Sequence, residues 1–97
     1  MLRRATTVFG AIAHPVRRDL LEAMREAARP LSITELGARC EVSRSTASRH
    51  LDILRGAGMV VARSAQPAVL HELDPTAFAA IESWLWPFVE SPVGAGT

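Results

Sequence analysis

The segment from Ser32 to Val60 constrains the fold of this chain more than any other, because it contains signals for two short helices with almost no chain between them. Ser32 followed by Glu35 at the third position after it is a capping box, in which each side chain bonds the backbone N–H of the other residue. Pro30 cannot continue an earlier helix, so any preceding helix must end before this residue. The pattern predicts a first helix that runs to about Cys40.

The second helix is expected to begin at the N-cap residue Ser43 and to reach about Gly56, with Gly58 suited to a left-handed exit. Only Glu41 and Val42 then separate the two helices. So short a turn forces the helices to cross steeply, which predicts a helix-turn-helix.

The second helix has two different faces when its residues are placed at about 100° per residue. Ala47, Leu51 and Leu54 fall on one apolar face that can pack on the first helix. The other face and the N-terminal end carry hydroxyl and guanidinium groups, from Arg44, Ser45, Thr46, Ser48 and Arg49. Arginine can pair bidentately with guanine, and serine or threonine can bond several bases or phosphates. This face therefore suits the major groove of DNA, although a merely solvated surface remains the alternative.

Two short extended runs follow, at residues 59–64 and 68–73, around the turn-forming residues Ala65, Gln66 and Pro67. They predict a β-hairpin. Asp74 and Pro75 then supply an N-cap and a first helical residue for a last helix that runs to about Val89. The expected fold class is mainly α with a small β-hairpin, in the order α-α-α-α-β-β-α, which is a winged helix-turn-helix.

The chain resembles the ArsR-type winged-helix transcriptional repressors over roughly Ala11 to Glu90. The matching stretches are IAHPVRRDLLEAM, SRSTASRHLDILRGAGMV and ELDPTAF. The resemblance implies a homodimeric repressor that reads a palindromic operator with the helix at residues 43–56 in the major groove. It also implies a dimer interface formed by the helix at the N-terminal end of the chain and the last helix. The DNA contacts that it implies are Arg44, Ser45, Thr46, Ser48, Arg49 and the wing residue Arg63.

The distribution of charge agrees with a DNA surface in this region. Residues 39–63 carry five arginines against two acids, whereas residues 64–97 carry four acids and no arginine or lysine. Positive charge is thus concentrated where the DNA contacts are expected. Chance clustering in a small protein is the alternative.

Both ends of the chain carry apolar stripes at helical spacing, which predict self-association. The residues expected at a dimer interface are Leu2, Ala5, Phe9, Phe78, Ile81, Leu85 and Phe88. An isologous dimer would cover these stripes and supply the two-fold axis that a palindromic operator needs. The alternative is that both stripes close the core of a single chain.

Length and composition predict one domain at residues 1–90 and a flexible tail at residues 91–97. No apolar run approaches the length of a membrane span, and no targeting signal is recognisable. The single cysteine excludes an internal disulfide and fits a reducing compartment, so a cytoplasmic location is expected.

The sequence predicts neither a metal site nor a cofactor. Members of the resembled family that sense arsenic or cadmium carry a Cys-x-Cys pair, and the matching positions here are Ser32 and Thr34. The last helix has no histidine, which the zinc- and nickel-sensing members use there. Cys40 is expected to be a small packing residue. An unidentified small-molecule or protein effector remains open.

An enzyme is not expected, because no Ser/His/Asp or Cys/His set can be placed together and no glycine-rich phosphate loop is present. The remaining alternative is a winged-helix module for protein interaction that has lost DNA binding. The hairpin tip at residues 65–68 favours that alternative, because it lacks arginine.

Overall fold

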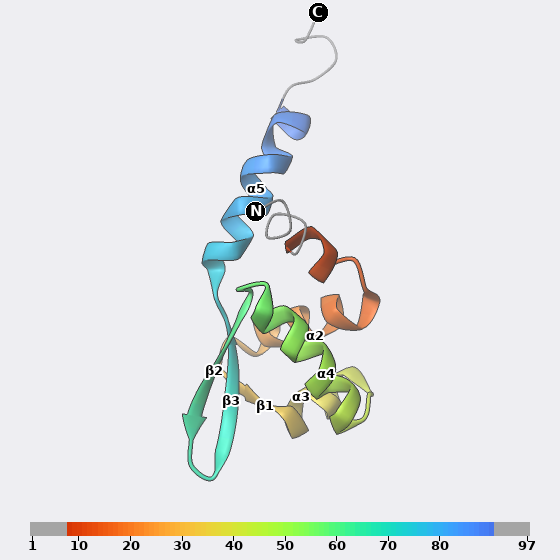
Figure 1. The fold of residues 1–97 in the computed structure, drawn as a ribbon, viewed down its shortest axis with the longest axis vertical. Helices are drawn as coiled ribbons and strands as arrows, with labels where there is room; N and C mark the ends of the chain where they lie inside the picture. Colours follow the sequence, from red (N-terminus) through yellow and green to blue (C-terminus); the bar gives the residue numbers. More distant parts are fainter. Residues whose placement is uncertain (1–7, 91–97) are drawn as a thin grey trace, which may run out of the picture.

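The computed structural model describes residues 8–90 and shows a bundle of helices with a small antiparallel sheet and one long projecting helix (Figure 1). Residues 8–11 are helical. The elements that follow are α2 (Pro15–Ala27), β1 (Leu31–Ser32), α3 (Ile33–Cys40), α4 (Arg44–Gly56), β2 (Val60–Ala65), β3 (Ala68–Leu73) and α5 (Pro75–Glu90). The expected winged helix-turn-helix is confirmed, with β1 as an additional strand.

The core lies where α2, α3 and α4 pack together against the base of the sheet. The apolar face expected for α4 is confirmed, since Ala47, Leu51 and Leu54 are all buried. The core residues are Ala11, Leu20, Leu21, Ala23, Met24, Leu31, Leu36, Ala47, Leu51, Leu54, Met59 and Val60. Burial of a large aliphatic side chain contributes about 1.5–3 kcal/mol, so this cluster fixes how α4 sits on α3.

The capping box at the start of α3 is confirmed. The Ser32 hydroxyl accepts from the Glu35 amide at 3.1 Å, and the Ser32 amide donates to Glu35 Oε1 at 2.9 Å. Arg29 donates to the same carboxylate at 2.9 Å. This hydrogen bond, together with the one from Ser32, lowers the pKa of Glu35 to about 2.

The turn between α3 and α4 places Glu41 in the left-handed region, with φ 58° and ψ 44°. A residue other than glycine thus adopts positive φ at this turn. Gly37 permits the close approach of the turn, because a Cβ atom at this position would lie 2.9 Å from the carbonyl oxygen of Val42. The Val42 amide donates to the Gly37 carbonyl at 2.9 Å and closes the turn.

The hairpin forms as expected, but it is joined by β1 to make a three-stranded sheet in the order β1-β3-β2. Leu31 pairs with His71 and Ser32 pairs with Leu70 in antiparallel register. β1 could not be predicted from the sequence, because two residues are too few to show an alternating pattern. The strand ties the wing to the residue that caps α3.

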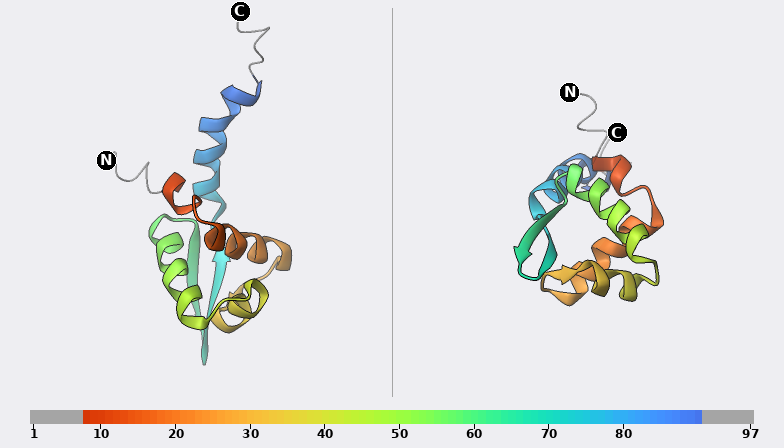
Figure 2. Two further views of the ribbon diagram at one scale, coloured as in Figure 1. Left: turned by 90° about the vertical axis from the view of Figure 1, so that its right-hand side faces the viewer. Right: turned by 60° about the horizontal axis from the view of Figure 1, so that its bottom comes forward.

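Helix α5 begins where the Asp74 carboxylate accepts from the Thr76 amide at 3.0 Å, as the Asp-Pro pair predicted. Only the first half of α5 packs on the core, through the half-buried Phe78 and Ile81. The second half projects away from the body, in the direction opposite to the hairpin (Figure 1). The helical residues 8–11 lie beside it (Figure 2). The expected interface residues Leu2 and Ala5 and the expected tail at residues 91–97 lie outside the described residues.

Candidate nucleic-acid interface

The outward face of α4 is the candidate site. Arg44, Ser45 and Arg49 are exposed, and Thr46 and Ser48 are half-buried at the edges of the same face. The structure therefore brings together the five α4 residues that the sequence singled out. The opposite side of the helix is held by the core, so this face is open to solvent in the described chain.

Hydroxyl groups order the N-terminal turn of α4. The Ser43 hydroxyl accepts from the Thr46 amide at 3.1 Å and donates to the Thr46 hydroxyl at 3.0 Å. The Ser45 hydroxyl lies 3.2 Å from the same Ser43 oxygen. A helix N-terminus carries a partial positive charge and unpaired amide groups, so a turn fixed in this way can receive a phosphate oxygen.

The arginines of α4 differ in their partners. Arg55, near the C-terminus of the helix, forms an ion pair with Asp52 at 2.7 Å. Arg44 and Arg49 form no hydrogen bond or ion pair with another residue of the described chain. Their guanidinium groups can therefore bind an external anion or a base edge without first breaking an internal contact.

The wing differs from this helix. Arg63 of β2 is exposed, but it forms an ion pair with Glu72 of the neighbouring strand. The two residues are diagonal neighbours on one face of the hairpin, since Arg63 lies opposite Leu70 and Glu72 lies opposite Val61. Sequence reasoning missed this pair because it depends on the strand register. Any contact of Arg63 with DNA has to compete with its carboxylate partner.

A family model described as a helix-turn-helix domain matches residues 12–63, which span α2 to the first half of the wing. The HTH-type transcriptional regulator Rv2034 of Mycobacterium tuberculosis is 38% identical over 81 residues, which cover 84% of this chain and 74% of that protein. The chain belongs to the helix-turn-helix transcriptional regulators.

Solved structures of ArsR-type proteins share the fold. The ArsR-like transcriptional regulator from Rhodococcus sp. RHA1 superposes with a TM-score of 0.79 at 20% identity, over 91% of this chain and 79% of that chain. The homodimeric winged helix-turn-helix DNA-binding domain of Mb0332 from Mycobacterium bovis gives a TM-score of 0.72 at 20% identity, over 95% of this chain and 87% of that chain. The ArsR-type fold thus extends through α5.

Of the two positions matched to the Cys-x-Cys pair, Ser32 has a structural role here. Ser32 caps α3 and is committed to the capping box. In the part of the chain that the structure describes, no three His, Cys, Asp or Glu side chains converge as ion ligands. Cys40 is half-buried against the core, as expected, and burial together with the negative charge of Asp19 raises the pKa of its thiol. That shift disfavours the reactive thiolate at neutral pH.

The three histidines have structural partners. His14 caps α2, because its Nδ1 atom accepts from the Val16 amide at 3.2 Å. His50 is buried against α2, and His71 is buried in the sheet with its Nδ1 atom 3.4 Å from the Leu31 carbonyl oxygen.

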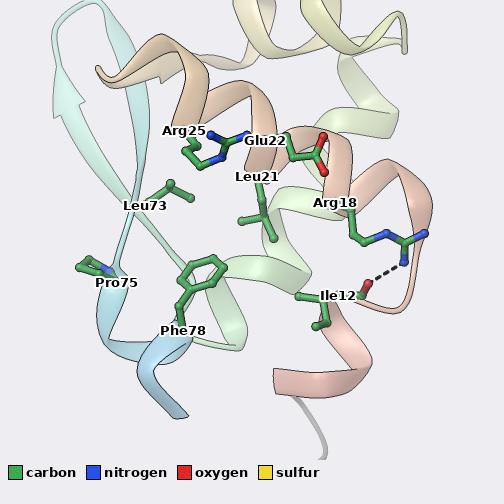
Figure 3. Close-up of a pocket in the computed structure, with 8 residues that line it drawn as sticks. All are labelled: Ile12, Arg18, Leu21, Glu22, Arg25, Leu73, Pro75 and Phe78. Carbon is green, nitrogen blue, oxygen red and sulfur yellow. Dashed lines mark hydrogen bonds between the residues drawn. The ribbon is translucent and has the colours of Figure 1, made fainter. Parts of the chain in front are cut away.

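An apolar groove lies between α2 and the first turn of α5 (Figure 3). It encloses about 420 Å³ over Ile12, Leu21 and Phe78, with Arg18 and Arg25 at its rim. Small-molecule sites commonly have volumes of about 300–1,000 Å³. The expectation of an effector stays a prediction.

Within residues 8–90, no helix is long and apolar enough to cross a membrane. The cytoplasmic location stays a prediction.

Proposed function

We propose that this ArsR-type regulator is a homodimeric repressor that reads a palindromic operator with α4, its recognition helix, in the major groove. Arg44, Ser45, Thr46, Ser48 and Arg49 are the proposed contacts. The observation that carries the proposal is the orientation of α4, whose apolar side is buried while its guanidinium and hydroxyl groups face solvent. Recognition helices commonly contact base edges through their N-terminal residues.

The proposed contacts divide into two kinds. Arg44 is the first residue of α4, where a long cationic side chain is suited to phosphate. Arg49 lies further along the exposed face, where a guanidinium group can reach the O6 and N7 atoms of guanine. Arg63 is proposed as a weaker wing contact, because it is already paired with Glu72.

The dimer is proposed from the second half of α5. Trp84, Trp86 and Phe88 are 56%, 53% and 68% exposed, and Leu85 and Val89 of the same helical turns are exposed as well. Single chains in water rarely expose contiguous apolar patches of this kind without a partner. A second copy that contributes the same surface would cover it through a two-fold axis. Phe9, Phe78, Ile81, Leu85 and Phe88 are the described residues proposed for this interface.

The experiment that tests the proposal is footprinting of the purified protein on the DNA that flanks its own gene. Two protected half-sites should appear about 34 Å, one helical turn, apart. Because neutralised phosphates release counterions, the logarithm of the affinity should fall linearly with the logarithm of salt concentration. Protection of only one half-site would contradict the two-fold arrangement. Equal binding to the flanking DNA and to random DNA would contradict recognition of an operator.

A second candidate function is a module for protein interaction that has lost DNA binding. The pairing of Arg63 with Glu72 favours it, because the wing then offers little free positive charge. Arg44 and Arg49, which have no hydrogen-bond or ion-pair partner within residues 8–90, oppose it. Equal and weak binding to flanking and random DNA in the same experiment would favour this second candidate.

A further inference from the structure

Arg17 of α2 makes three contacts, two with the N-terminal helical segment and one with α4. Its Nε atom donates to the Ala11 carbonyl at 2.7 Å, and one terminal nitrogen donates to the Gly10 carbonyl at 3.2 Å. The other terminal nitrogen lies 3.2 Å from Nδ1 of His50 in α4. One half-buried guanidinium group therefore bridges the last helical residues of the N-terminal segment and the recognition helix.

The N-terminal segment is in turn attached to α5. Phe9 lies two residues before Ala11, and its ring packs edge-on against Trp84 with 5.2 Å between the ring centroids. A continuous series of contacts thus runs from the exposed apolar surface of α5, through residues 9–11 and Arg17, to His50. His50 is followed by the buried Leu51 and preceded by Arg49, a proposed DNA contact.

The contact with His50 has a defined direction of hydrogen bonding. Arginine has only donors, so Nδ1 of His50 must be the acceptor and the ring must be neutral. The ring is also packed against His14, with centroids 4.5 Å apart, and His14 is held by its bond to the Val16 amide. The Arg17 guanidinium group and the His14 ring therefore hold His50 from two sides.

We propose that Arg17 is a positioning residue that couples the N-terminal segment, and with it the dimer surface of α5, to the recognition helix, and so sets operator affinity. The inference rests on the proposed function for its effect on DNA, but the coupling itself is a property of the free protein. Arg17 itself is not a proposed DNA contact. It holds α4 at the angle at which a second α4 in the dimer can engage the same operator.

Arg18 supplies the matched control. It is the next residue of α2, and it donates to the Ile12 carbonyl at 2.8 Å (Figure 3). It thus anchors the same N-terminal turn but makes no hydrogen bond to α4 among the described residues. Arg17→Gln and Arg18→Gln remove the same charge from neighbouring positions, so any difference between them reports the link to His50.

The first experiment compares these variants in operator binding and in amide exchange. Arg17→Gln should weaken operator affinity about tenfold, which corresponds to roughly 1.4 kcal/mol, and Arg18→Gln by about twofold or less. The dimer dissociation constant should stay within about twofold of wild type in both. In the DNA-free protein, amide exchange of α4 should be faster in Arg17→Gln and unchanged in Arg18→Gln.

A pH profile separates positioning from a general structural role. Protonation of His50 would place a donor against the Arg17 donor. Because burial lowers the pKa of His50, wild-type operator affinity should be highest at about pH 7.5 and should fall only as the pH drops below the ordinary histidine pKa of about 6.5. Burial disfavours a positive charge on His50, and so would a positive charge on any of the titratable and charged groups that face it, which are His14, Arg17 and Arg49. His50→Asn keeps an acceptor close to the Nδ1 position at every pH. It should retain near wild-type affinity at the higher pH and should not show this loss at the lower one.

Equal operator affinities and equal α4 exchange in the two arginine variants would overturn the inference. Identical pH profiles for wild type and His50→Asn would also overturn it. A wild-type protein that binds no operator contradicts the proposed function instead, and in that case the exchange data still decide whether Arg17 holds α4.

Discussion

The ring of Phe9 meets the ring of Trp84 edge-on, with 5.2 Å between their centroids, and this contact joins the N-terminal helical residues to α5. Trp84 also packs against Phe88 with 4.9 Å between centroids. Aromatic side chains from both ends of the chain therefore form one surface. Most of that surface is exposed in a single copy, which is the structural basis of the proposed dimer.

Phe88→Ala should dissociate the dimer while leaving the single chain folded. Phe88 is exposed in one copy, so its loss removes little from the core. An isologous interface contains it twice, and the change should weaken dimerisation by about 3 kcal/mol, or roughly 100-fold. Analytical ultracentrifugation measures this shift. Val69→Ala, an exposed apolar change on the wing, is the control, and equal dimerisation constants for the two variants would argue against this interface.

Two glycine substitutions should change stability in opposite directions. A Cβ atom at Gly37 would lie 2.9 Å from the Val42 carbonyl oxygen, so Gly37→Ala should reduce the free energy of unfolding by about 1–3 kcal/mol. A Cβ atom at Gly56 meets nothing within 4 Å, and Gly56→Ala should increase that free energy by up to about 1 kcal/mol. Urea unfolding measures both. A Gly37→Ala protein as stable as wild type would contradict the close turn.

The stability of the protein should fall when the pH drops from about 7.5 to about 5.5. Burial lowers the pKa of both His50 and His71, so the unfolded chain binds more protons than the folded chain at pH values below the ordinary histidine pKa. The stabilisation is complete above that ordinary pKa, about 6.5, and is lost as the pH falls toward the lowered values. Urea titrations at both ends of this range measure the loss. The variant His50→Asn should lose less stability over this range. A wild-type free energy of unfolding that does not change with pH would refute the assignment of neutral histidine rings.

Local rules predicted much of the fold. The caps at Ser32, Ser43 and Asp74 and the apolar face of α4 each depend on residues within one or two turns of the chain, and all were confirmed. The same logic selected the outward face of α4, since a helix with one buried side must expose the other.

Contacts between distant residues could not be predicted in this way. The pairing of Leu31 with His71 spans 40 residues, and the contact of Arg17 with His50 spans 33. Neither pair has a local pattern that would indicate it, because both depend on how the elements pack. The ion pair of Arg63 with Glu72 depends on the hairpin register, which a charge count along the chain does not reveal.

The central claim is that the outward face of α4 reads DNA, and the most direct measurement is the affinity of wild type and Arg49→Ala for the operator and for random DNA at fixed salt. Arg25→Ala is the matched control, because Arg25 is an exposed arginine on α2 beside the groove. Arg49→Ala should weaken operator binding by about 1–3 kcal/mol and random binding much less, while Arg25→Ala should change both slightly. Equal losses for Arg49→Ala and Arg25→Ala on both DNAs would contradict it.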